Sequence, residues 1–390
     1  MSALAGRLQL GGWRWVFLLL MGGGATASFL AARYGLKVTT QLSDVMPWGL
    51  CLGLNVFCGI ALAAGALTFA SVAAVIGGRD WRVVGRACLV AGSIGYLVAM
   101  LGMIASEPTG KYWRTLVYGW TPRSILSGAV WTVILLALLL FLEFLPQYSV
   151  SLARTRWFAT LRRLDLPLLI LAAILAVLHQ FGLNRLVQLA ETRFSPLWSG
   201  PSLSLMFYLS SLAMALAVLL FASWRSRLAS GKALPSSVLP ATARALTAVV
   251  FVYIVLRLMD LLQRGLFSSM FSASREGLLL LLEIAVLLIG MMWLKGNEQE
   301  PGELFFGSAL IIAGVMANRL NTAITALEAG AGQNYLPRWS EFLIAYSLIA
   351  AGVAAFALGV KHMSVFAESE IDAVAYAVGL RPVLTEARWN

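Results

Sequence analysis

The chain has 390 residues, of which 60% are hydrophobic and only 12% are charged, and its formal net charge is +11. Its mean hydropathy of +0.83 is too high for a water-soluble domain of this length. The composition therefore excludes a soluble globular protein and predicts an integral membrane protein. The positive charge requires no nucleic-acid partner, because the basic residues fall in the loops between apolar segments.

Ten apolar segments follow one another along the chain, each close to the roughly 20 residues that cross a bilayer. Their uniform Leu, Ala, Val and Met content favours helices over the alternating strands of an outer-membrane barrel. We therefore predict an all-α integral membrane protein with about ten transmembrane helices. The predicted helices are 13–32, 47–76, 87–106, 125–145, 166–186, 203–223, 243–262, 277–294, 304–324 and 343–360.

Lys and Arg are more frequent in the loops that share a side of the membrane with the N-terminus than in the other loops. By the positive-inside rule, this asymmetry predicts that both termini are cytoplasmic. The direction of every predicted helix follows from that orientation, so polar residues can be sorted by depth.

A first polar cluster is predicted near the outer face, where the second to fifth helices meet. It holds few formal charges and suits a neutral polar ligand, since polar groups in spanning helices are costly and often mark function. Its candidate residues are Trp48, Asn55, Ser106, Glu107, Ser124, His179 and Gln180.

A second cluster, in the other half of the chain, is predicted to be a buried charge network. Arg257 and Asp260 lie three residues apart on one helix face and are expected to pair. The other members are Glu283, Arg319 and Glu341. A charge-compensated structural network and a functional site both remain open for this cluster.

The chain has two histidines, His179 near the outer end of its helix and His362 after the last helix. By the helix rise of about 1.5 Å per residue, they lie roughly a membrane thickness apart and cannot ligate one haem. We therefore expect no haem. We expect no metal either, because the spacing of the three cysteines is neither a zinc nor an iron–sulfur spacing.

A quinone requires an apolar slot, a hydrogen-bonding group for each carbonyl, and a group that exchanges protons. Histidine titrates near neutrality and can serve in that last role. His179, with Asn55, Gln180 and Glu107 predicted at similar depth, meets these requirements.

Several motifs together resemble a known family. They are PWGLCLGLNVFCGIALAAGALTFA, WTPRSILSGAVW, LEFLP, LHQFGLNRL followed by SPLW, VLRLMDLLQRG, LLLLLEI, ANRLN and YLPRWSEFLIA. Their order and content are similar to the NrfD-type membrane subunits of the polysulfide reductase superfamily, and closest to the HybB-type branch, often called Ni/Fe-hydrogenase cytochrome b subunits. The resemblance covers the chain from about Pro47 to Phe366.

The resemblance implies a haem-free subunit of the bacterial cytoplasmic (inner) membrane that binds exchangeable menaquinone or ubiquinone. Its implied partners are a periplasmic-side iron–sulfur (ferredoxin-like) or multihaem cytochrome subunit and a catalytic subunit of the hydrogenase or molybdoenzyme type. It also implies a first four-helix bundle over 47–190 and a second over 201–325, with helices 13–32 and 340–361 beside them and a cytoplasmic tail over 362–390. The matching residues are His179 and Gln180 in LHQ, Trp48 and Gly49 in PWG, Arg257 and Asp260 as the arginine–acid pair, and Arg319 in NRL.

Three departures from the family pattern concern carboxylates in the first bundle. Asn55, Ser106 (followed by Glu107) and Gly128 stand where relatives usually carry acids. We expect quinone binding to survive, because asparagine can hydrogen-bond a carbonyl, whereas proton translocation through this bundle becomes doubtful.

The leading hypothesis is a quinone-binding membrane anchor of a respiratory oxidoreductase, not catalytic by itself, with His179 bonded to the head group. A second hypothesis is a structural anchor whose quinone site has decayed and which translocates no protons. A third hypothesis is a secondary transporter, which broken helices at the bilayer midplane would favour. The prolines, Pro167 among them, are instead expected at or near helix ends.

Overall fold

The protein is described from a computed structural model that covers residues 2–43, 45–106, parts of 131–139, 156–189, 194–296, 300–362 and 365–366. Strands are absent from these residues. The α-helices are α1 (Ser2–Tyr34), α2 (Leu36–Thr39), α3 (Cys58–Ile76), α4 (Arg79–Ser106), α8 (Arg156–Leu189), α9 (Leu203–Ser230), α10 (Leu239–Gln263), α11 (Arg275–Gly296), α12 (Pro301–Leu320), α13 (Ala326–Ala331) and α14 (Trp339–His362). Four short elements complete the set, namely the π-helical η1 (Leu52–Phe57) and η5 (Asn321–Thr325) and the 3-10 turns η3 (Pro196–Trp198) and η4 (Ser268–Phe271).

The predicted all-α membrane architecture is confirmed. Among the described residues, eight helices are long and apolar enough to cross a membrane. They coincide with the first three and the last five predicted helices. The fifth predicted helix corresponds to α8, whose apolar part is the shorter stretch Leu166–Gly182, and most of the fourth lies outside the described residues.

Pro167 is not at a helix end, contrary to expectation, but inside α8. The prediction was wrong because the helix begins at Arg156, well before the apolar stretch from which its start was inferred. A proline in a helix interior removes one backbone hydrogen bond, which membrane helices tolerate when neighbouring groups satisfy the freed carbonyl.

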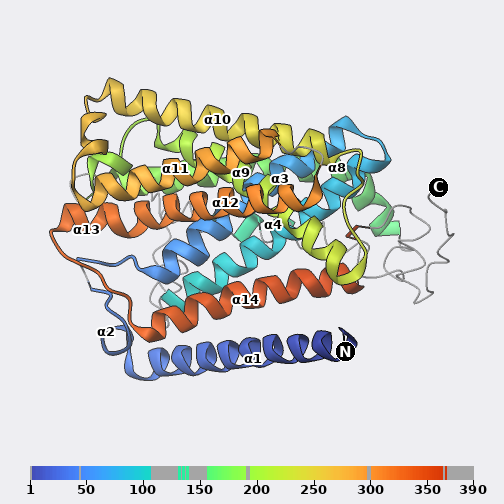
Figure 1. Cartoon of the computed structure of the whole chain (residues 1–390), viewed down its shortest axis with the longest axis horizontal. Helices are drawn as coiled ribbons and strands as arrows, with labels where there is room; N and C mark the ends of the chain where they lie inside the picture. Colours follow the sequence, from blue (N-terminus) through green and yellow to red (C-terminus); the bar gives the residue numbers. More distant parts are fainter. Residues whose placement is uncertain are drawn as a thin grey trace.

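Figure 1 shows the long helices running side by side, with α10 at one edge and α1 at the opposite edge. Helix α3 packs against α4 and α8, and it also contacts α9, which in turn packs against α10 and α12. Helix α11 lies against α10 and α12, while α1 packs along α14 and α14 along α4. The contact between α3 and α9 therefore joins the first half of the chain to the second.

Glycines allow the closest of these helix approaches. At Gly59 of α3, an added Cβ would lie 3.1 Å from the Cβ of Ala99 on α4. At Gly65 it would overlap the backbone of Ser211 on α9. Small residues are the usual means by which membrane helices bring their backbones together, because lipid supplies little hydrophobic force between helices.

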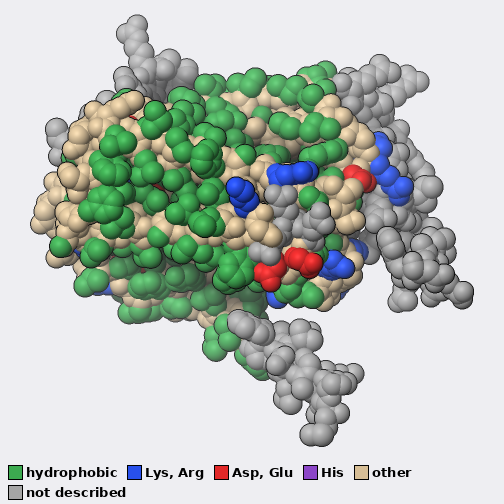
Figure 2. Space-filling model, turned by 45° about the horizontal axis from the view of Figure 1, so that its top comes forward, with side chains coloured by type: hydrophobic (Ala, Val, Ile, Leu, Met, Phe, Trp, Pro, Cys, Tyr) green, Lys and Arg blue, Asp and Glu red, His purple; other side chains and the backbone are tan. Residues whose placement is uncertain are grey.

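Hydrophobic side chains cover the lateral surface of the protein. On α10 and α11 they include Phe251, Leu262, Leu282 and Met292, all more than half exposed, as expected for surface that faces lipid. In Figure 2 the charged side chains lie mainly toward the right of the view, the side on which the chain begins in Figure 1.

The other end of the protein, at which α4 and α12 end and α14 begins, is the one predicted to face outward, and we call it the outer end. Two π-helical segments lie there and contact each other, η1 immediately before α3 and η5 immediately after α12. An added Cβ at Gly53 of η1 would lie 3.3 Å from the Cβ of Ala323 in η5. Because π-helical turns are frequently found at functional sites, the outer end is the first place to look for one.

Candidate functional site

The first predicted cluster is only partly assembled among the described residues. Asn55, His179 and Gln180 are all buried, whereas Trp48 is half-buried and packs its ring against Phe57 and Phe194, with ring centroids 5.6 and 5.2 Å away. Trp48 is therefore part of an aromatic packing group. Glu107, Ser124 and Gly128 lie outside the described residues.

His179 and Asn55 contact different levels of α4. The His179 ring lies 6.5 Å from the ring of Tyr96, measured between centroids, whereas the Cβ of Asn55 lies beside Gly102. Six residues of helix between Tyr96 and Gly102 correspond to about 9 Å. His179 thus lies further from the outer end than Asn55, and the two side chains contact different turns of α4.

The amide of Gln180 is fully buried, and neither its oxygen nor its nitrogen has a hydrogen-bond partner among the described residues. The Oδ1 of Asn55 is in the same condition, while its Nδ2 donates to the sulfur of Cys51 at 3.3 Å. Unsatisfied buried amides are costly, so these two positions are suited to a polar ligand or partner.

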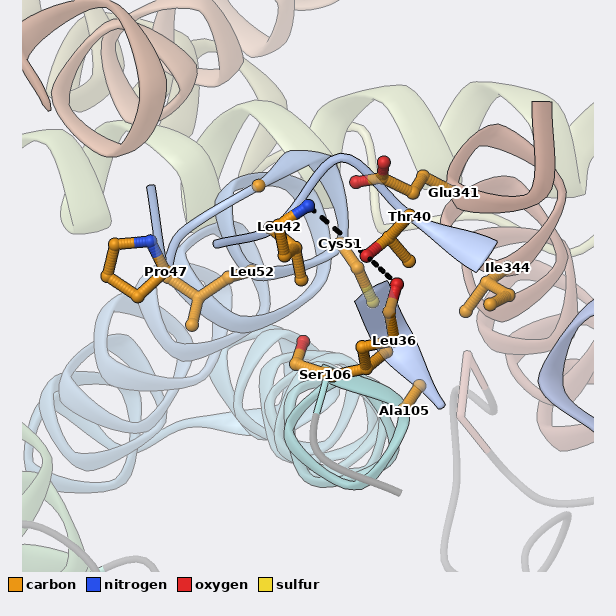
Figure 3. Close-up of a pocket in the computed structure, with 11 residues that line it drawn as sticks. Leu36, Thr40, Leu42, Pro47, Cys51, Leu52, Ala105, Ser106, Glu341 and Ile344 are labelled. Carbon is orange, nitrogen blue, oxygen red and sulfur yellow. Dashed lines mark hydrogen bonds between the residues drawn. The ribbon is translucent and has the colours of Figure 1, made fainter. Parts of the chain in front are cut away.

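A small, partly open pocket of about 20 Å³, room for roughly one water molecule, lies at the outer end, and we call it the outer pocket. It is formed where α2, the start of η1, the end of α4 and the start of α14 meet, and Figure 3 shows Glu341 and Thr40 on one side of it and Ser106 on the opposite side. Its walls are mainly apolar. The residues used below are Leu36, Thr40, Cys51, Leu52, Ser106 and Glu341.

Glu341 is the carboxylate of the outer pocket, and its side chain is only 3% exposed. Its Oε1 accepts hydrogen bonds from the backbone N–H groups of Gln41, at 2.8 Å, and Arg338, at 3.2 Å. Its Oε2 accepts a short hydrogen bond from the hydroxyl of Tyr335. Glu341 is therefore fixed by three donors and ties the start of α14 to the loop between α2 and η1.

The Tyr335 hydroxyl is held between Glu341 and the start of the second predicted helix, because it also accepts a hydrogen bond from the Leu50 N–H at 2.9 Å. Burial raises the pKa of this phenol, and the hydrogen bond to Glu341 and its charge raise the pKa further. The hydrogen bond from the Leu50 N–H lowers the pKa of Tyr335, but by less than burial and Glu341 raise it. Tyr335 consequently remains protonated near neutral pH and donates to Glu341.

Gly49, the glycine of the PWG motif, lies directly against this pair. A Cβ at position 49 would overlap the Tyr335 hydroxyl and lie 2.7 Å from the Cδ2 of Leu42 and 3.0 Å from the Oε2 of Glu341. The close approach of these three side chains therefore requires glycine here.

Replacing Gly49 by alanine is expected to destabilise the protein by about 1–3 kcal/mol, the usual range for overpacking, because the added methyl group must displace Tyr335 from Glu341. Thermal unfolding in detergent measures the effect. Gly22→Ala on α1 is the control, since an added Cβ there meets nothing within 4 Å. Equal melting temperatures for the two variants would contradict the prediction.

The second predicted cluster is centred on Glu283 of α11, which is completely buried. Its carboxylate accepts hydrogen bonds from the side chains of Tyr253 (3.1 Å), Asn318 (2.9 Å), Asn321 (3.1 Å) and Trp198 (3.2 Å). We call these five residues the Glu283 cluster. Neutral donors from η3, α10, α12 and η5 thus satisfy this carboxylate, without a direct ion pair to a described residue.

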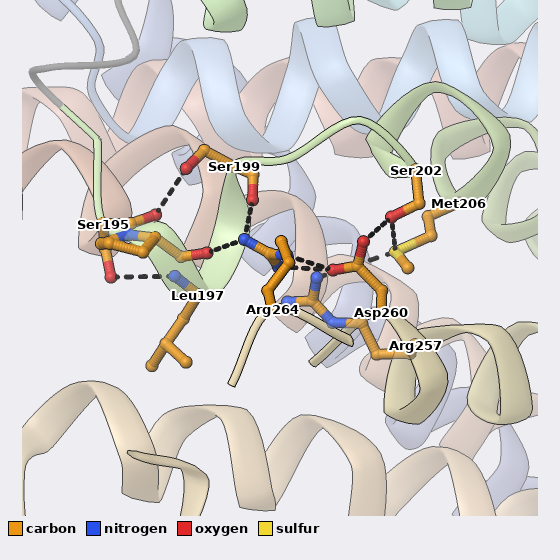
Figure 4. A network of polar contacts seen from close by, with 9 residues as sticks. Ser195, Leu197, Ser199, Ser202, Met206, Arg257, Asp260 and Arg264 are labelled. Atoms are coloured by element: carbon orange, nitrogen blue, oxygen red, sulfur yellow. Dashed lines mark hydrogen bonds and ion pairs between the residues drawn. The ribbon is translucent and has the colours of Figure 1, made fainter. Parts of the chain in front are cut away.

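The expected pairing of Arg257 with Asp260 is corrected by the structure. Asp260 instead forms an ion pair with Arg264, the C-terminal cap residue of α10, and accepts a hydrogen bond from Ser202 (Figure 4). Arg264 also donates to the carbonyls of Pro196 and Ser199, at 2.7 and 2.6 Å. Arg264 pairs with Asp260 in place of Arg257 because its guanidinium also donates hydrogen bonds to these two loop carbonyls.

Arg257 and Arg319 remain buried without a carboxylate partner among the described residues. Arg257 donates to the sulfur of Met206 at 3.7 Å. Arg319 donates to the Phe207 carbonyl and the Ser210 hydroxyl, both at 2.8 Å, and its guanidinium lies 4.1 Å from the centre of the Phe207 ring. Arg319 thus binds α12 to α9 through neutral acceptors and a cation–π contact.

The residue that sequence reasoning missed is Tyr335, and Glu341 was assigned to the charge network, not to a pocket. The available signal was the motif YLPRWSE, which places a tyrosine six residues before the acid at a predicted helix start. That spacing alone does not reveal that the connecting turn folds the hydroxyl back onto the carboxylate.

Two curated proteins are similar to nearly the whole chain. The chain is 24% identical over 345 residues to the probable Ni/Fe-hydrogenase 2 b-type cytochrome subunit of Escherichia coli (strain K12), covering 85% of this chain and 86% of that protein. It is also 24% identical over 359 residues to a protein of Nitratidesulfovibrio vulgaris (strain Hildenborough), covering 88% and 92%. No protein-family model matches the chain. The similarity to the Escherichia coli protein confirms the resemblance to the HybB-type branch.

The expectation of no haem is contradicted by this relative, because the name b-type cytochrome subunit implies haem in that protein. Haem iron is held by residues such as His, Met, Cys or Tyr. His179 is buried and of suitable chemistry, while the side chain of His362, the other histidine, lies outside the described residues. The described histidines therefore provide at most one axial ligand.

Proposed function

We propose that this chain is the membrane subunit of a hydrogenase-type respiratory oxidoreductase and exchanges electrons between the menaquinone or ubiquinone pool and a partner subunit. The observation that carries the proposal is the pair of buried amides of Asn55 and Gln180, whose oxygens have no hydrogen-bond partner among the described residues and suit a polar ligand. Similarity over 85% of the chain to a protein named as a Ni/Fe-hydrogenase b-type cytochrome subunit supports the type of complex.

The outer pocket is too small for a quinone ring in this structure, but its lining has the chemistry that such a ring requires. Binding sites for small molecules are mostly apolar with a few placed polar groups, and here leucine side chains form walls around Cys51, Ser106 and Glu341. Because the pocket lies at the outer end of helices whose sides face lipid, a quinone could reach it from the bilayer. Asn55, bonded to Cys51, lies behind the same wall.

The partner is proposed to dock on the outer, periplasmic side and to carry iron–sulfur or multihaem centres, with a hydrogenase- or molybdoenzyme-type catalytic subunit beyond it. The family resemblance supports these partners and this side. The protein is proposed to lie in the bacterial inner membrane with both termini in the cytoplasm, as the distribution of Lys and Arg favours.

Blocking the pocket tests the function. Leu36 of α2 is half-buried in the pocket wall, and Leu36→Trp is expected to lower quinone-linked electron transfer by the assembled complex about tenfold or more, the effect of losing roughly 1.4 kcal/mol of binding. His179→Ala is expected to lower it too if the deeper histidine also contacts the quinone. Activity with an artificial electron acceptor, which bypasses the quinone, should be unchanged in both variants.

The outcomes separate the hypotheses. If neither variant affects quinone-linked transfer in an intact complex, the chain is a structural anchor. If Leu36→Trp acts and His179→Ala does not, the quinone is confined to the outer pocket and His179 has another role.

A further inference from the structure

We infer that the partner subunit docks on an exposed, ordered loop at the outer end, and that its docking face carries an apolar pocket surrounded by Asp and Glu side chains. The loop is the connection 332–338, which joins α13 to α14 and which we call the outer loop. In Figure 1 it passes along the left end of the molecule, beside α2. The inference rests on the proposed function and specifies the surface and the chemistry through which the partner binds.

The outer loop exposes apolar side chains. Leu336 is 77% exposed, more than any other large hydrophobic side chain among the described residues, and Trp339, at the start of α14, is 64% exposed. Val38 of α2, whose carbonyl accepts a hydrogen bond from the Arg338 side chain of the loop, is also mostly exposed. Adjacent exposed apolar side chains of this kind mark surfaces that bind other proteins or membranes.

Contact with lipid does not account for the exposure of Leu336. Helix α14 has 24 residues, so at about 1.5 Å per residue it is about 36 Å long and by itself exceeds the hydrocarbon core of about 30 Å. Arg338, exposed and charged, stands between Leu336 and this helix and belongs outside the hydrocarbon. Trp339 alone would suit the aromatic belt of a membrane protein, whereas a leucine beyond the arginine favours a protein partner.

The outer loop is held in place by hydrogen bonds on its inner side. The N–H of Tyr335 donates to the Glu328 carboxylate at 2.6 Å, and the Tyr335 hydroxyl and the Arg338 N–H both donate to Glu341. Tyr335 is buried and its neighbour Leu336 is exposed, so the two side chains point to opposite sides of the loop. A surface that is ordered before binding loses less conformational entropy when a partner docks.

The charges exposed at the outer end are positive. Its buried carboxylates are Asp260, Glu328 and Glu341, and Glu276 is half-buried. Among the described residues of this end, the exposed charged side chains are Arg33, Lys37, Arg275 and Arg338. The positive-inside rule collects basic residues on the opposite side of the membrane, so it does not account for these exposed cations.

The cations border the apolar side chains. Arg338 bonds to the carbonyl of Val38, which follows Lys37 in α2. Arg275 pairs with Glu328 at 3.2 Å and keeps more than half of its side chain in solvent. Protein interfaces typically have an apolar centre and a polar rim, with Trp and Arg enriched. The complement of this surface is an apolar pocket surrounded by carboxylates, which would also speed association.

Photo-cross-linking in the assembled complex tests the contact. Leu336→benzoylphenylalanine carries the probe, and Leu228→benzoylphenylalanine is the control, because Leu228 is 61% exposed near the end of α9, at the opposite end of the protein. After illumination of intact membranes, mass spectrometry identifies what is attached. We expect the probe at position 336 to label a chain with iron–sulfur or haem centres, in a peptide rich in Asp and Glu. The control should leave that chain unlabelled.

The labelled partner is then purified and rebound to the full chain in lipid nanodiscs. Leu336→Asp should weaken binding about tenfold or more, because a few anchors at the centre of an interface carry most of the affinity. Lys37→Glu should slow association about two- to fivefold, as expected for one exposed charge pair, and should reduce its dependence on salt. Leu228→Asp and Arg225→Glu, both exposed near the opposite end of α9, should bind as the unaltered chain does.

The results separate the inference from the proposed function. If the complex contains a redox subunit but the probe at position 336 labels only lipid or no chain, the inference is overturned and the proposed function stands. The same holds if the labelled peptide is not acidic, if Leu336→Asp binds as tightly as Leu228→Asp, or if Lys37→Glu associates at the unaltered rate. If no chain of the complex carries iron–sulfur or haem centres, the proposed function fails and the inference fails with it.

Discussion

Replacing Glu283 by alanine is expected to destabilise the protein by at least about 3 kcal/mol, because each buried donor left without a partner costs about 1–3 kcal/mol. The substitution removes the acceptor for Trp198, Tyr253, Asn318 and Asn321 at once. Those donors come from four different elements, so the loss would loosen η3, α10, α12 and η5 together.

The accessibility of buried thiols measures this effect. Cys58 and Cys88 are free and buried, so a thiol-reactive dye added during a thermal ramp reports when the helices separate. Glu303→Ala is the control, because its carboxylate also accepts an indole N–H, from Trp293, but in an exposed position. If the Glu283→Ala protein has the same melting temperature as the Glu303→Ala protein, the Glu283 cluster contributes little to stability.

The helices could be predicted from the sequence because hydrophobicity over about 20 residues is a local property. Their number and order among the described residues were correct. Their ends were less accurate, since α4 begins at Arg79 and α8 at Arg156, in polar stretches that contribute turns beyond the apolar core. The π-helical segments were not predicted, because an extra residue in a helical turn leaves no mark on composition.

The site could be predicted only in part, for a different reason. Burial of Arg257, Asp260, Glu283, Arg319 and Glu341 was expected from their positions in apolar segments, and all five are buried. Their partners depend on how neighbouring helices rotate and how deeply they sit. Asp260 therefore pairs with Arg264, although Arg257 was equally available by spacing. His179 and Asn55 were predicted at similar depth, but the residues of α4 that they face are about 9 Å apart along the helix.

The outer pocket was beyond prediction because it joins distant parts of the chain. The hydrogen bond from Gln41 to Glu341 links residues 300 positions apart. The PWG motif and the acid at the start of the last helix were each noted in the sequence, but as separate features. Only the fold shows that Gly49 is small because Tyr335 and Glu341 occupy the space beside it.

Replacing Gly65 by valine is expected to be as damaging as the loss of Glu283, at least about 3 kcal/mol, the upper end of the range for overpacking. An added Cβ would overlap the Ser211 carbonyl oxygen and lie 2.6 Å from its carbon and 2.8 Å from the Cβ of Ala215. Backbone atoms cannot rotate away as side chains do, so α3 and α9 must separate.

That separation would reach beyond the helix contact, because Ser211 is also one of the acceptors of Arg319, at 3.2 Å. Moving Ser211 would weaken the bonds that hold a completely buried guanidinium, and an unsatisfied buried charge is strongly destabilising. Gly85→Ala on α4 is the matched control, since its added Cβ would make ordinary contacts no closer than 3.6 Å. Thermal unfolding should therefore separate the two variants clearly, and a Gly65→Val protein as stable as Gly85→Ala would mean that the two halves of the chain do not depend on this contact.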